Sequence, residues 1–432
     1  MNLVEELKWR GLIHDIMPGT EAQLQKESTT AYIGFDPTSD SLHVGSFVQI
    51  ILLKHLYNFG HKPFALVGGA TGMIGDPSGK SDERNLLDEA TLTKNVEGIK
   101  KVLSTFLDFN SKEKNAPVLV NNYDWMKDFT FINFARDIGK RITVNYMMSK
   151  DSVKKRIEGE GEGMSFTEFT YQLLQGYDFY YLHKNYNCKL QMGGSDQWGN
   201  ITTGTELIRR MNVDNENKAK AFALTSPLIT KADGGKFGKS EKGNIWLDAE
   251  KTSVYQFYQF WLNATDTDAE KYIKIFTFLP KNEIDALIDS HRNEPHLRLL
   301  QKKLAEEVTT MVHSKNEYEK AVEASQLLFG GGSKEKLATI DFATILDIFN
   351  GVPQKEIEKN DVIGKPIVDV LSGITGFLPS KSEANRALKE NSISVNQEKV
   401  SSEYTVSEND IINNNFILLQ RGKKNYFILR IV

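Results

Sequence analysis

The chain has 432 residues, of which 40% are hydrophobic and 25% are charged. This composition is typical of a folded globular protein with two to four domains at roughly 150 residues each, and it excludes bulk disorder. The longest nearly apolar stretch, residues 47–53, is too short to span a bilayer, and the first residues lack the basic-then-apolar pattern of a secretory signal. A single cysteine, Cys188, excludes an internal disulfide. We therefore expect a cytoplasmic protein without a membrane segment.

The net charge of −4 does not give the basic footprint that is usual for a nucleic-acid-binding protein. The charge is uneven, however, because residues 379–432 carry eight Lys or Arg against six acidic residues. A local patch such as residues 421–424 (RGKK) matters more than this sum, because attraction to phosphate acts within a Debye length of ~8–10 Å.

The first half of the chain predicts a parallel α/β unit. Residues 29–35 (TTAYIGF) are β-branched and aromatic and end at Asp36-Pro37, residues 46–59 are a helix closed by Gly60, and residues 62–67 (KPFALV) are a second strand. A strand, a helix and a second apolar strand form a right-handed crossover, and such sheets bind ligands beyond the carboxyl ends of their strands. Residues 36–46 and 68–80 occupy those positions.

The remaining elements follow in order. We expect strands at 116–120 and 188–192, helices at 130–146 and 165–181, and a further helix from about 195 to 211. Residues 252–328 read as almost entirely helical, and Gly330-Gly-Gly-Ser333 as a flexible joint. A small α+β tail has a helix at 380–389 and strands at 392–395, 416–420 and 426–431.

Three segments indicate phosphate chemistry. Residues 75–81 (GDPSGKS) are one residue short of a phosphate-binding P-loop, so a polar turn is the alternative. Residues 43–46 (HVGS) begin a helix, where free N–H groups and the dipole attract phosphate, although a capped helix start explains them as well. Residues 236–240 (KFGKS) lie in a Gly-rich loop, which is either a solvated basic turn or a mobile loop that closes on a leaving pyrophosphate.

Taken together, these segments resemble the two signatures of class I aminoacyl-tRNA synthetases, and six ordered motifs resemble the tyrosyl-tRNA synthetases of bacteria. The motifs are Tyr32-Ile-Gly-Phe-Asp-Pro-Thr, Gly68-Gly-Ala-Thr-Gly-Met-Ile-Gly-Asp-Pro-Ser-Gly-Lys, Val144-Asn-Tyr-Met-Met, Ser165-Phe-Thr-Glu-Phe, Gly193-Gly-Ser-Asp-Gln-Trp-Gly-Asn and Lys236-Phe-Gly-Lys-Ser. The tail from Pro379 resembles an S4-type RNA-binding module. Two positions depart from these patterns: Ser46, where the first signature commonly ends in His, and Asn385, where S4 modules often have a basic residue.

The resemblance implies an architecture. It is α/β, with a Rossmann-like parallel-sheet catalytic domain at residues 1–230 that contains a dimer-contact region at about 125–165. A signature loop and helical tRNA-recognition domain would follow at 231–329, a linker at 330–360, and an S4-like domain at 361–432. The implied partners are L-tyrosine, ATP with Mg²⁺ bound mainly through ATP, tRNA(Tyr), and a second copy of the chain in a homodimer.

The resemblance also implies a two-step reaction: tyrosine and ATP give tyrosyl-adenylate and pyrophosphate, and a terminal ribose hydroxyl of tRNA then takes the tyrosyl group. No protein metal ligand is implied. The catalytic residues would be His43, Thr38, Lys80, Arg84, Lys236 and Lys239. The tyrosine-binding residues would be Tyr32, Asp76, Tyr171, Gln175, Asp178 and Gln197. ATP would contact Gly34, Asp36, His43, Gly45, Ser46, Gly194, Asp196, Lys236 and Lys239. The tRNA would contact Arg209, Arg210, Lys381, Arg386, Arg421, Lys423 and Lys424.

Two other interpretations remain open from the sequence. A synthetase for a different aromatic amino acid would share the fold, but Tyr32 and Asp178 argue against tryptophan, which has no phenol. A non-catalytic RNA-binding relative would be expected to have lost His43 or the Lys236/Lys239 pair, and all three residues are present.

Overall fold

The computed structural model describes residues 1–78, 87–158, 163–215, 219–240, 243–329, 334–340, 342–349, 352–422 and 425–432. The chain forms two compact units. The first comprises Met1–Thr252 and Phe260–Val312, and the second comprises Ser253–Gln259 and His313–Val432. Within the described residues, no helix is both long and apolar enough to cross a bilayer.

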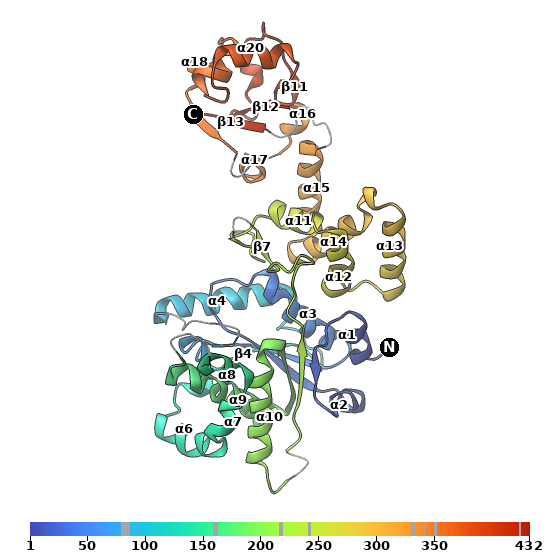
Figure 1. Cartoon of the computed structure of the whole chain (residues 1–432), viewed down its shortest axis with the longest axis vertical. Helices are drawn as coiled ribbons and strands as arrows, with labels where there is room; N and C mark the ends of the chain where they lie inside the picture. Colours follow the sequence, from blue (N-terminus) through green and yellow to red (C-terminus); the bar gives the residue numbers. More distant parts are fainter. Residues whose placement is uncertain are drawn as a thin grey trace. The chain divides into compact units, whose positions relative to one another are not determined.

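The first unit is built on a six-stranded sheet with the order β1-β6-β5-β2-β3-β4 (Figure 1). Only β1 is antiparallel to its neighbour. The strands predicted from the sequence are confirmed with small shifts at their ends, and β3 is confirmed residue for residue. The strands are β1 (Asp15–Ile16), β2 (Thr30–Phe35), β3 (Lys62–Val67), β4 (Val118–Asn121), β5 (Cys188–Gly194) and β6 (Phe222–Ser226).

Helices cover both faces of this sheet. The crossover from β2 to β3 through α3 and the crossover from β5 to β6 through α10 run in opposite directions along the sheet order. Right-handed connections therefore place α3 and α10 on opposite faces, as Figure 1 shows. The helices up to β6 are α1 (Leu3–Trp9), α2 (Thr20–Lys26), α3 (Val44–Asn58), α4 (Glu89–Phe106), α5 (Tyr123–Met126), α6 (Phe131–Asp137), α7 (Val144–Met148), α8 (Asp151–Glu158), α9 (Phe166–Tyr186) and α10 (Trp198–Met211).

The single helix predicted at 130–146 is wrong. The segment forms α6, a 3₁₀ turn at Gly139–Arg141 and α7. The Thr143 side chain accepts a hydrogen bond from the Tyr146 backbone N–H at 3.3 Å and so begins a new helix. Threonine favours such caps because its hydroxyl competes with the backbone ladder. The neighbouring Ile142 is extended, which ends the preceding turn.

After β6 the chain is mainly helical, as predicted for residues 252–328, although Ser253–Gln259 belong to the second unit. The short strands β7 (Lys239–Ser240) and β8 (Gly243–Asn244) precede α11 (Val254–Leu262), α12 (Asp266–Phe276), α13 (Lys281–Asn293) and α14 (Leu299–Val312). Arg10 of the N-terminal segment is buried and donates to the Lys274, Thr277 and Leu279 carbonyls. One guanidinium thus donates to three carbonyls at and just after the end of α12, and it ties that end to the N-terminal segment.

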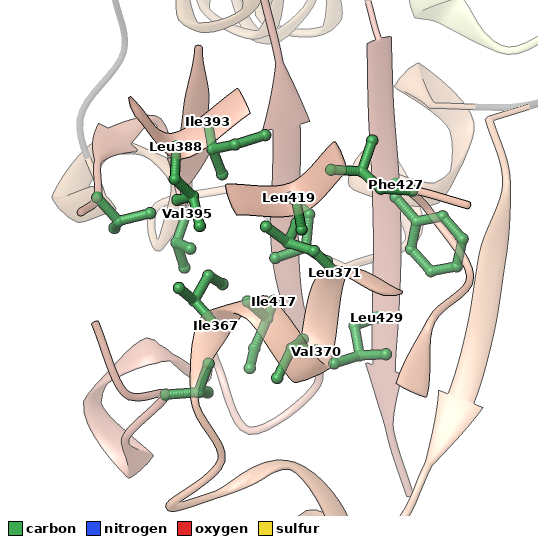
Figure 2. Packing of buried hydrophobic residues seen from close by; sticks show 14 of the residues in the cluster. Ile367, Val370, Leu371, Leu388, Ile393, Val395, Ile417, Leu419, Phe427 and Leu429 are labelled. Carbon is green, nitrogen blue, oxygen red and sulfur yellow. The ribbon is translucent and has the colours of Figure 1, made fainter. Parts of the chain in front are cut away.

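The second unit contains a five-stranded sheet with the order β11-β10-β12-β13-β9, in which only β9 is parallel to its neighbour. Its core is a cluster of aliphatic side chains that includes Ile367, Leu371, Leu388, Leu419 and Leu429, as Figure 2 shows. The predicted tail helix and its three strands are confirmed, whereas the predicted joint at 330–333 lies outside the described residues. The elements are α15 (Lys315–Phe329), α16 (Lys334–Leu337), α17 (Phe342–Ile348), β9 (Gln354–Ile357), α18 (Lys359–Val362), α19 (Ile367–Asp369), α20 (Lys381–Lys389), β10 (Ile393–Val395), β11 (Glu398–Lys399), β12 (Phe416–Arg421) and β13 (Asn425–Ile431).

Candidate active site

A cleft of about 610 Å³ lies in the first unit at the carboxyl ends of β2 and β5. These adjacent strands are the point at which the sheet order reverses, and α/β sheets bind ligands at such a point. Sixteen of the residues named in the sequence analysis line this cleft, so the fold brings together groups that are up to 207 positions apart, from Tyr32 to Lys239. They are Tyr32, Gly34, Asp36, Thr38, His43, Gly45, Ser46, Asp76, Tyr171, Gln175, Asp178, Gly194, Asp196, Gln197, Lys236 and Lys239. Lys80 and Arg84 lie outside the described residues.

Asp178 is buried on α9 and is held by two donors that the sequence analysis did not identify. Trp125 Nε1 donates to Asp178 Oδ1 at 2.8 Å, and Asn122 Nδ2 donates to Asp178 Oδ2 at 3.0 Å. Tyr32 is also buried, and its hydroxyl has no hydrogen-bond partner. An unpaired buried hydroxyl beside a fixed carboxyl group is suited to bind a ligand hydroxyl.

Burial controls the protonation of this pair. It raises the pKa of Asp178 to about 8, against the opposing effect of the hydrogen bonds from Asn122 and Trp125. Burial, with the nearby Asp178, also raises the pKa of Tyr32 above its ordinary value. Both shifts have the same main cause, because a buried group loses its hydration in the charged form.

A second network joins Asp36 to Asp178. Tyr171 Oη donates to Asp36 Oδ2 at 2.6 Å, and Thr71 Oγ1 donates to Asp36 Oδ1 at 2.7 Å. Asn122 Nδ2 donates to Thr71 Oγ1 at 3.0 Å as well as to Asp178. The polar groups on this side of the cleft therefore hold each other in place before a ligand binds.

A third set surrounds Asp76. Gln197 Nε2 donates to Asp76 Oδ2 at 2.6 Å, and the Ser78 backbone N–H donates to Asp76 Oδ1 at 2.9 Å. Asn200 Nδ2 donates to Gln175 Oε1 at 3.0 Å. Burial, with the nearby Asp76, raises the pKa of Asp196. Two carboxyl groups and three amides thus lie on one side of the cleft, which is suited to hold a cationic group.

His43 caps the N-terminus of α3. Its Nδ1 accepts a hydrogen bond from the Gly45 backbone N–H at 3.0 Å. A Cβ at position 45 would lie 2.7 Å from His43 Cε1, so only glycine allows the imidazole to lie back over the helix start. The ring is thereby directed to one position at the cleft wall.

The segment 236–240 is anchored through Phe237. This ring is buried and stacks on Phe276 at a centroid distance of 5.3 Å, with further contacts to Trp261 and Tyr272. Lys236 and Lys239 flank Phe237 and are exposed at the cleft. The aromatic contact therefore fixes the backbone between two lysines while their ammonium groups stay in solvent.

Comparisons with known proteins identify the family of this chain. A family model for tRNA synthetases class I (W and Y) matches residues 24–330, and a model for the tyrosine–tRNA ligase SYY-like C-terminal domain matches residues 344–429. The chain is 73% identical to the tyrosine–tRNA ligase of Flavobacterium johnsoniae over 432 residues, which is the full length of both chains. The chain belongs to the tyrosine–tRNA ligase family. The tyrosine–tRNA ligase of Porphyromonas gingivalis is 60% identical over 99% of each chain.

Solved structures support the same assignment. A C-terminally truncated mitochondrial tyrosyl-tRNA synthetase from Aspergillus nidulans is 32% identical, with a TM-score of 0.68 over 76% of this chain and 94% of that chain. A tryptophanyl-tRNA synthetase from Encephalitozoon cuniculi has a TM-score of 0.52 at 13% identity and shows a likeness of fold alone. The tyrosine–tRNA ligase family therefore accounts for the whole chain, including the tail.

The residues of this tyrosine–tRNA ligase predicted to contact tRNA do not line the cleft. Arg209 and Arg210 both bond Glu206 on α10, at 2.8 and 2.5 Å. In the second unit the described residues of this group also have acidic partners. Lys381 lies 2.5 Å from Asp369, Arg386 lies 3.9 Å from Glu383, and Arg421 lies 2.8 Å from Glu383. Lys423 and Lys424 lie outside the described residues.

The sequence analysis missed several functional side chains. Thr71 and Asn200 lie inside motifs that it quoted, so their polar character was available as a signal. Asn122 follows β4, and a polar residue at the end of a parallel strand could have been selected by that rule. Trp125 offered no such signal. Among the described residues, no group of three metal-ligating side chains gathers in one place.

Proposed function

We propose that this tyrosine–tRNA ligase activates L-tyrosine with ATP in the cleft and then transfers the tyrosyl group to the 3′-terminal ribose of tRNA(Tyr). The observation that carries the proposal is the unpaired hydroxyl of Tyr32 at the cleft wall beside the buried Asp178. A tyrosine phenol would donate to Asp178 and accept from Tyr32. Phenylalanine would leave these groups buried and unpaired, an effect of several orders of magnitude for which tyrosyl-tRNA synthetases are themselves the standard example.

The amino group of tyrosine would lie on the wall formed by Asp76, Tyr171 and Gln175. Asp76 lines the cleft with an ordered carboxyl group, because two protein donors hold its oxygens. A carboxylate and two neutral acceptors match the three donors of an ammonium group. Gln197 would lie beside the tyrosine carboxylate.

In the first step, a carboxylate oxygen of tyrosine attacks the α-phosphorus of ATP. The bond from that phosphorus to the bridging oxygen breaks, and pyrophosphate leaves with the electron pair. Tyrosine itself supplies the nucleophile, so the protein acts by positioning and by stabilising charge. Gly34, Asp36, Gly45, Ser46, Gly194 and Asp196 would hold the nucleoside.

His43, Thr38, Lys236 and Lys239 would stabilise the negative charge that develops on the phosphates, together with Lys80 and Arg84. The exposed positions of Lys236 and Lys239 suit a role at the departure of pyrophosphate. Mg²⁺ would bind together with ATP, mainly through the phosphate oxygens, because Mg²⁺ prefers oxygen ligands of this kind.

The experiment that tests the reaction is ATP–pyrophosphate exchange with a panel of amino acids. Tyrosine should support rapid exchange, and phenylalanine and tryptophan should support almost none. Equal exchange with phenylalanine would mean that the phenol site is placed wrongly. No exchange with any amino acid, while the protein binds ATP, would refute the activity.

For the tail, we propose that residues 361–432 form an S4-like RNA-binding domain after a linker at 330–360, with residues 1–230 as the catalytic domain and 231–329 as the helical domain. The basic side chains of the tail support a role in phosphate contact. Truncation after residue 329 should preserve tyrosyl-adenylate formation and abolish tRNA charging. Loss of adenylate formation in a folded truncate would refute this division.

We also propose that the chain acts in the cytoplasm as a homodimer through residues 125–165. Phe131 and Ile132 are 71% and 74% exposed, Val144 and Met148 of the same region are exposed, and so is the adjacent Phe166. An apolar group of this kind is typical of a protein interface. Sedimentation should give a dimer, and Phe131→Asp with Ile132→Asp should give a monomer. A monomeric wild-type chain at micromolar concentration would refute the proposal.

A further inference from the structure

The residues that follow β8 pair with the backbone at the start of α3. The Val44 N–H donates to the Ile245 carbonyl at 2.9 Å, and the Ile245 N–H donates to the Gly238 carbonyl at 2.9 Å. A Cβ on Gly238 would lie 2.8 Å from Val44 Cγ2, so the two backbones approach closely. The Ile245 peptide groups therefore join residues 42–44 to the segment 236–240.

Two side chains extend this pairing outside the cleft. Trp246 lies opposite His43 in an antiparallel bridge, and the two rings meet edge-on at a centroid distance of 6.0 Å. Lys251 Nζ lies 5.3 Å from the centroid of the Trp246 ring and 2.5 Å from Asp40 Oδ1. Asp40 belongs to the loop that carries Thr38. One ammonium group thus contacts both this loop and the ring that packs on the imidazole.

The pair formed by Lys251 and Asp40 is partly shielded from solvent. Their side chains are 31% and 22% exposed, whereas the second partner of Asp40, Lys94, is 75% exposed. Hydrogen bonding from Lys251 and from Lys94 lowers the pKa of Asp40 to about 2. Lys251, Asp40 and Trp246 do not line the cleft. An effect of Lys251 on the reaction must therefore pass through a group that does, and Trp246 contacts such a group in His43.

We propose that Lys251 is a positioning residue for the formation of tyrosyl-adenylate. Through Trp246 and Asp40 it holds His43 in place next to the segment 236–240. This inference rests on the proposed activation of tyrosine by ATP, in which His43 stabilises charge on the phosphates. Such a group lowers the barrier only when it is fixed where the charge develops. The hydrogen bond at His43 Nδ1 is one constraint on the imidazole, and the contact with Trp246 is a second.

The test is single-turnover formation of tyrosyl-adenylate by Lys251→Met, which keeps an unbranched side chain and removes the charge. The rate at saturating tyrosine and ATP should fall about 10-fold, since a displacement of about 1 Å can lower a rate by about 10²-fold. The Kd values of tyrosine and ATP should stay the same. Lys251→Arg keeps the charge and the contact with an aromatic ring, so it should keep the wild-type rate. A wild-type rate for Lys251→Met overturns the proposal, as does a higher ATP Kd with an unchanged rate.

A double-mutant cycle shows whether the effect passes through His43. In a His43→Ala background, Lys251→Met should lower the rate less than about 2-fold, because the imidazole that it positions is absent. A purely structural loss would give the same decrease in both backgrounds, and that result overturns the proposal. Asp40→Asn keeps the shape of the side chain and should behave like Lys251→Met. It takes the place of Lys251→Met if that variant does not fold.

Lys94→Met is the matched control. Lys94 on α4 lies 3.1 Å from the other carboxyl oxygen of Asp40 and is exposed. Exposed ion pairs contribute little, so this variant should have the wild-type rate. A loss as large as that of Lys251→Met would mean that the charge of Asp40 alone matters, and it would overturn the proposal.

The same measurements separate this inference from the proposed function. If wild type forms no adenylate from tyrosine and ATP, the proposed function fails. If wild type forms adenylate and Lys251→Met is equally fast, only this inference fails.

Discussion

The two ends of the cleft are built differently. At the proposed tyrosine end, Asp178, Asn122, Trp125 and Thr71 are linked by hydrogen bonds of 2.8–3.0 Å, and most of this network is buried. At the proposed phosphate end, Lys236 and Lys239 are exposed at the cleft on either side of the buried Phe237 ring. A rigid buried network suits recognition of a ground state, whereas exposed cations suit charge that develops during the reaction. Four predictions test this contrast.

The largest effect is expected at the tyrosine end. Asp178→Ala removes the acceptor of the phenol and leaves two buried donors, Trp125 Nε1 and Asn122 Nδ2, without their partner. We expect kcat/KM for tyrosine to fall by about 10³-fold, since each lost bond to a charged or buried group adds to the penalty. The measurement is pyrophosphate exchange over a tyrosine titration at saturating ATP. An unchanged KM for tyrosine would place the phenol elsewhere.

At the phosphate end, Lys236→Ala should lower the single-turnover rate of adenylate formation by about 10²-fold, the scale of one preorganised stabilising contact. The tyrosine Kd should stay the same, because the proposed role of Lys236 is to stabilise the leaving pyrophosphate. The matched control is Lys231→Ala, because Lys231 lies five residues before Lys236 and does not line the cleft. A higher ATP Kd with an unchanged maximal rate would show that Lys236 binds ATP before the reaction. The two ends of the cleft would then not differ in the way described above.

Between the two ends, the loop that carries Asp36 and Thr38 is held from outside by α4. Asn95 Nδ2 donates to the Pro37 carbonyl at 2.9 Å, and a Cβ on Gly98 would lie 2.0 Å from the Asp40 carbonyl oxygen. Gly98→Ala should therefore destabilise the protein by about 1–3 kcal/mol, the cost of overpacking a close contact. Urea denaturation measures this loss.

The matched control for that loss is Gly373→Ala. A Cβ at position 373 meets nothing within 4 Å, so the free energy of unfolding should change little. If Gly98→Ala were as stable as Gly373→Ala, α4 would not clamp the loop. The loop that carries Asp36 and Thr38 would then be held no more firmly than the segment that carries Lys236 and Lys239.

The smallest effect concerns pH. Burial raises the pKa of Asp178 to about 8 in the ligand-free fold, whereas the unfolded value is ordinary, near 4. Between these values the folded state binds the extra proton, so the free energy of unfolding should fall as pH rises towards 8. Urea denaturation of wild type and Asp178→Asn at pH 6.5, 7.25 and 8 should show a steeper fall for wild type.

The pH range separates this effect from that of His55. Burial lowers the pKa of His55 to about 3, and its contribution to stability therefore rises with pH up to its unfolded value near 6.5. That contribution levels off above pH 6.5 and is the same in wild type and Asp178→Asn, so the difference between the two curves reports Asp178. Parallel curves for wild type and Asp178→Asn in this range would show that Asp178 is already charged in the free protein.

Much of the cleft could be predicted from the sequence because its residues lie at the ends of strands. Gly34, Asp36, Gly194 and Asp196 follow or end apolar runs whose parallel pairing was readable from the β-helix-β pattern. The carboxyl ends of such strands meet at one edge, so local patterns were sufficient to bring these residues together. The sequence motifs then indicated which chemical role to expect for each of these residues.

The break at residues 138–143 was not readable from periodicity. The apolar spacing across 130–146 fits one helix, and the competition between the Thr143 hydroxyl and the backbone ladder decided otherwise. The anchoring of Phe237 was equally hidden. In the sequence, a phenylalanine between two lysines indicates only a basic loop. The structure shows that its ring packs against Phe276, which lies 39 positions later in the chain.

The sequence by itself determined which chemical groups this protein has and the order in which the strands and helices present them. Only the tertiary structure decided their partners: Asp178 is held by Asn122 and Trp125, 56 and 53 positions earlier, and the Gln49 and Tyr32 side chains each keep one polar atom unpaired at the cleft. Which side chains bond to each other depends on the distances between helices and strands, and a local sequence pattern does not give these distances. Burial and hydrogen bonding are set only when the sheet and its helices have packed.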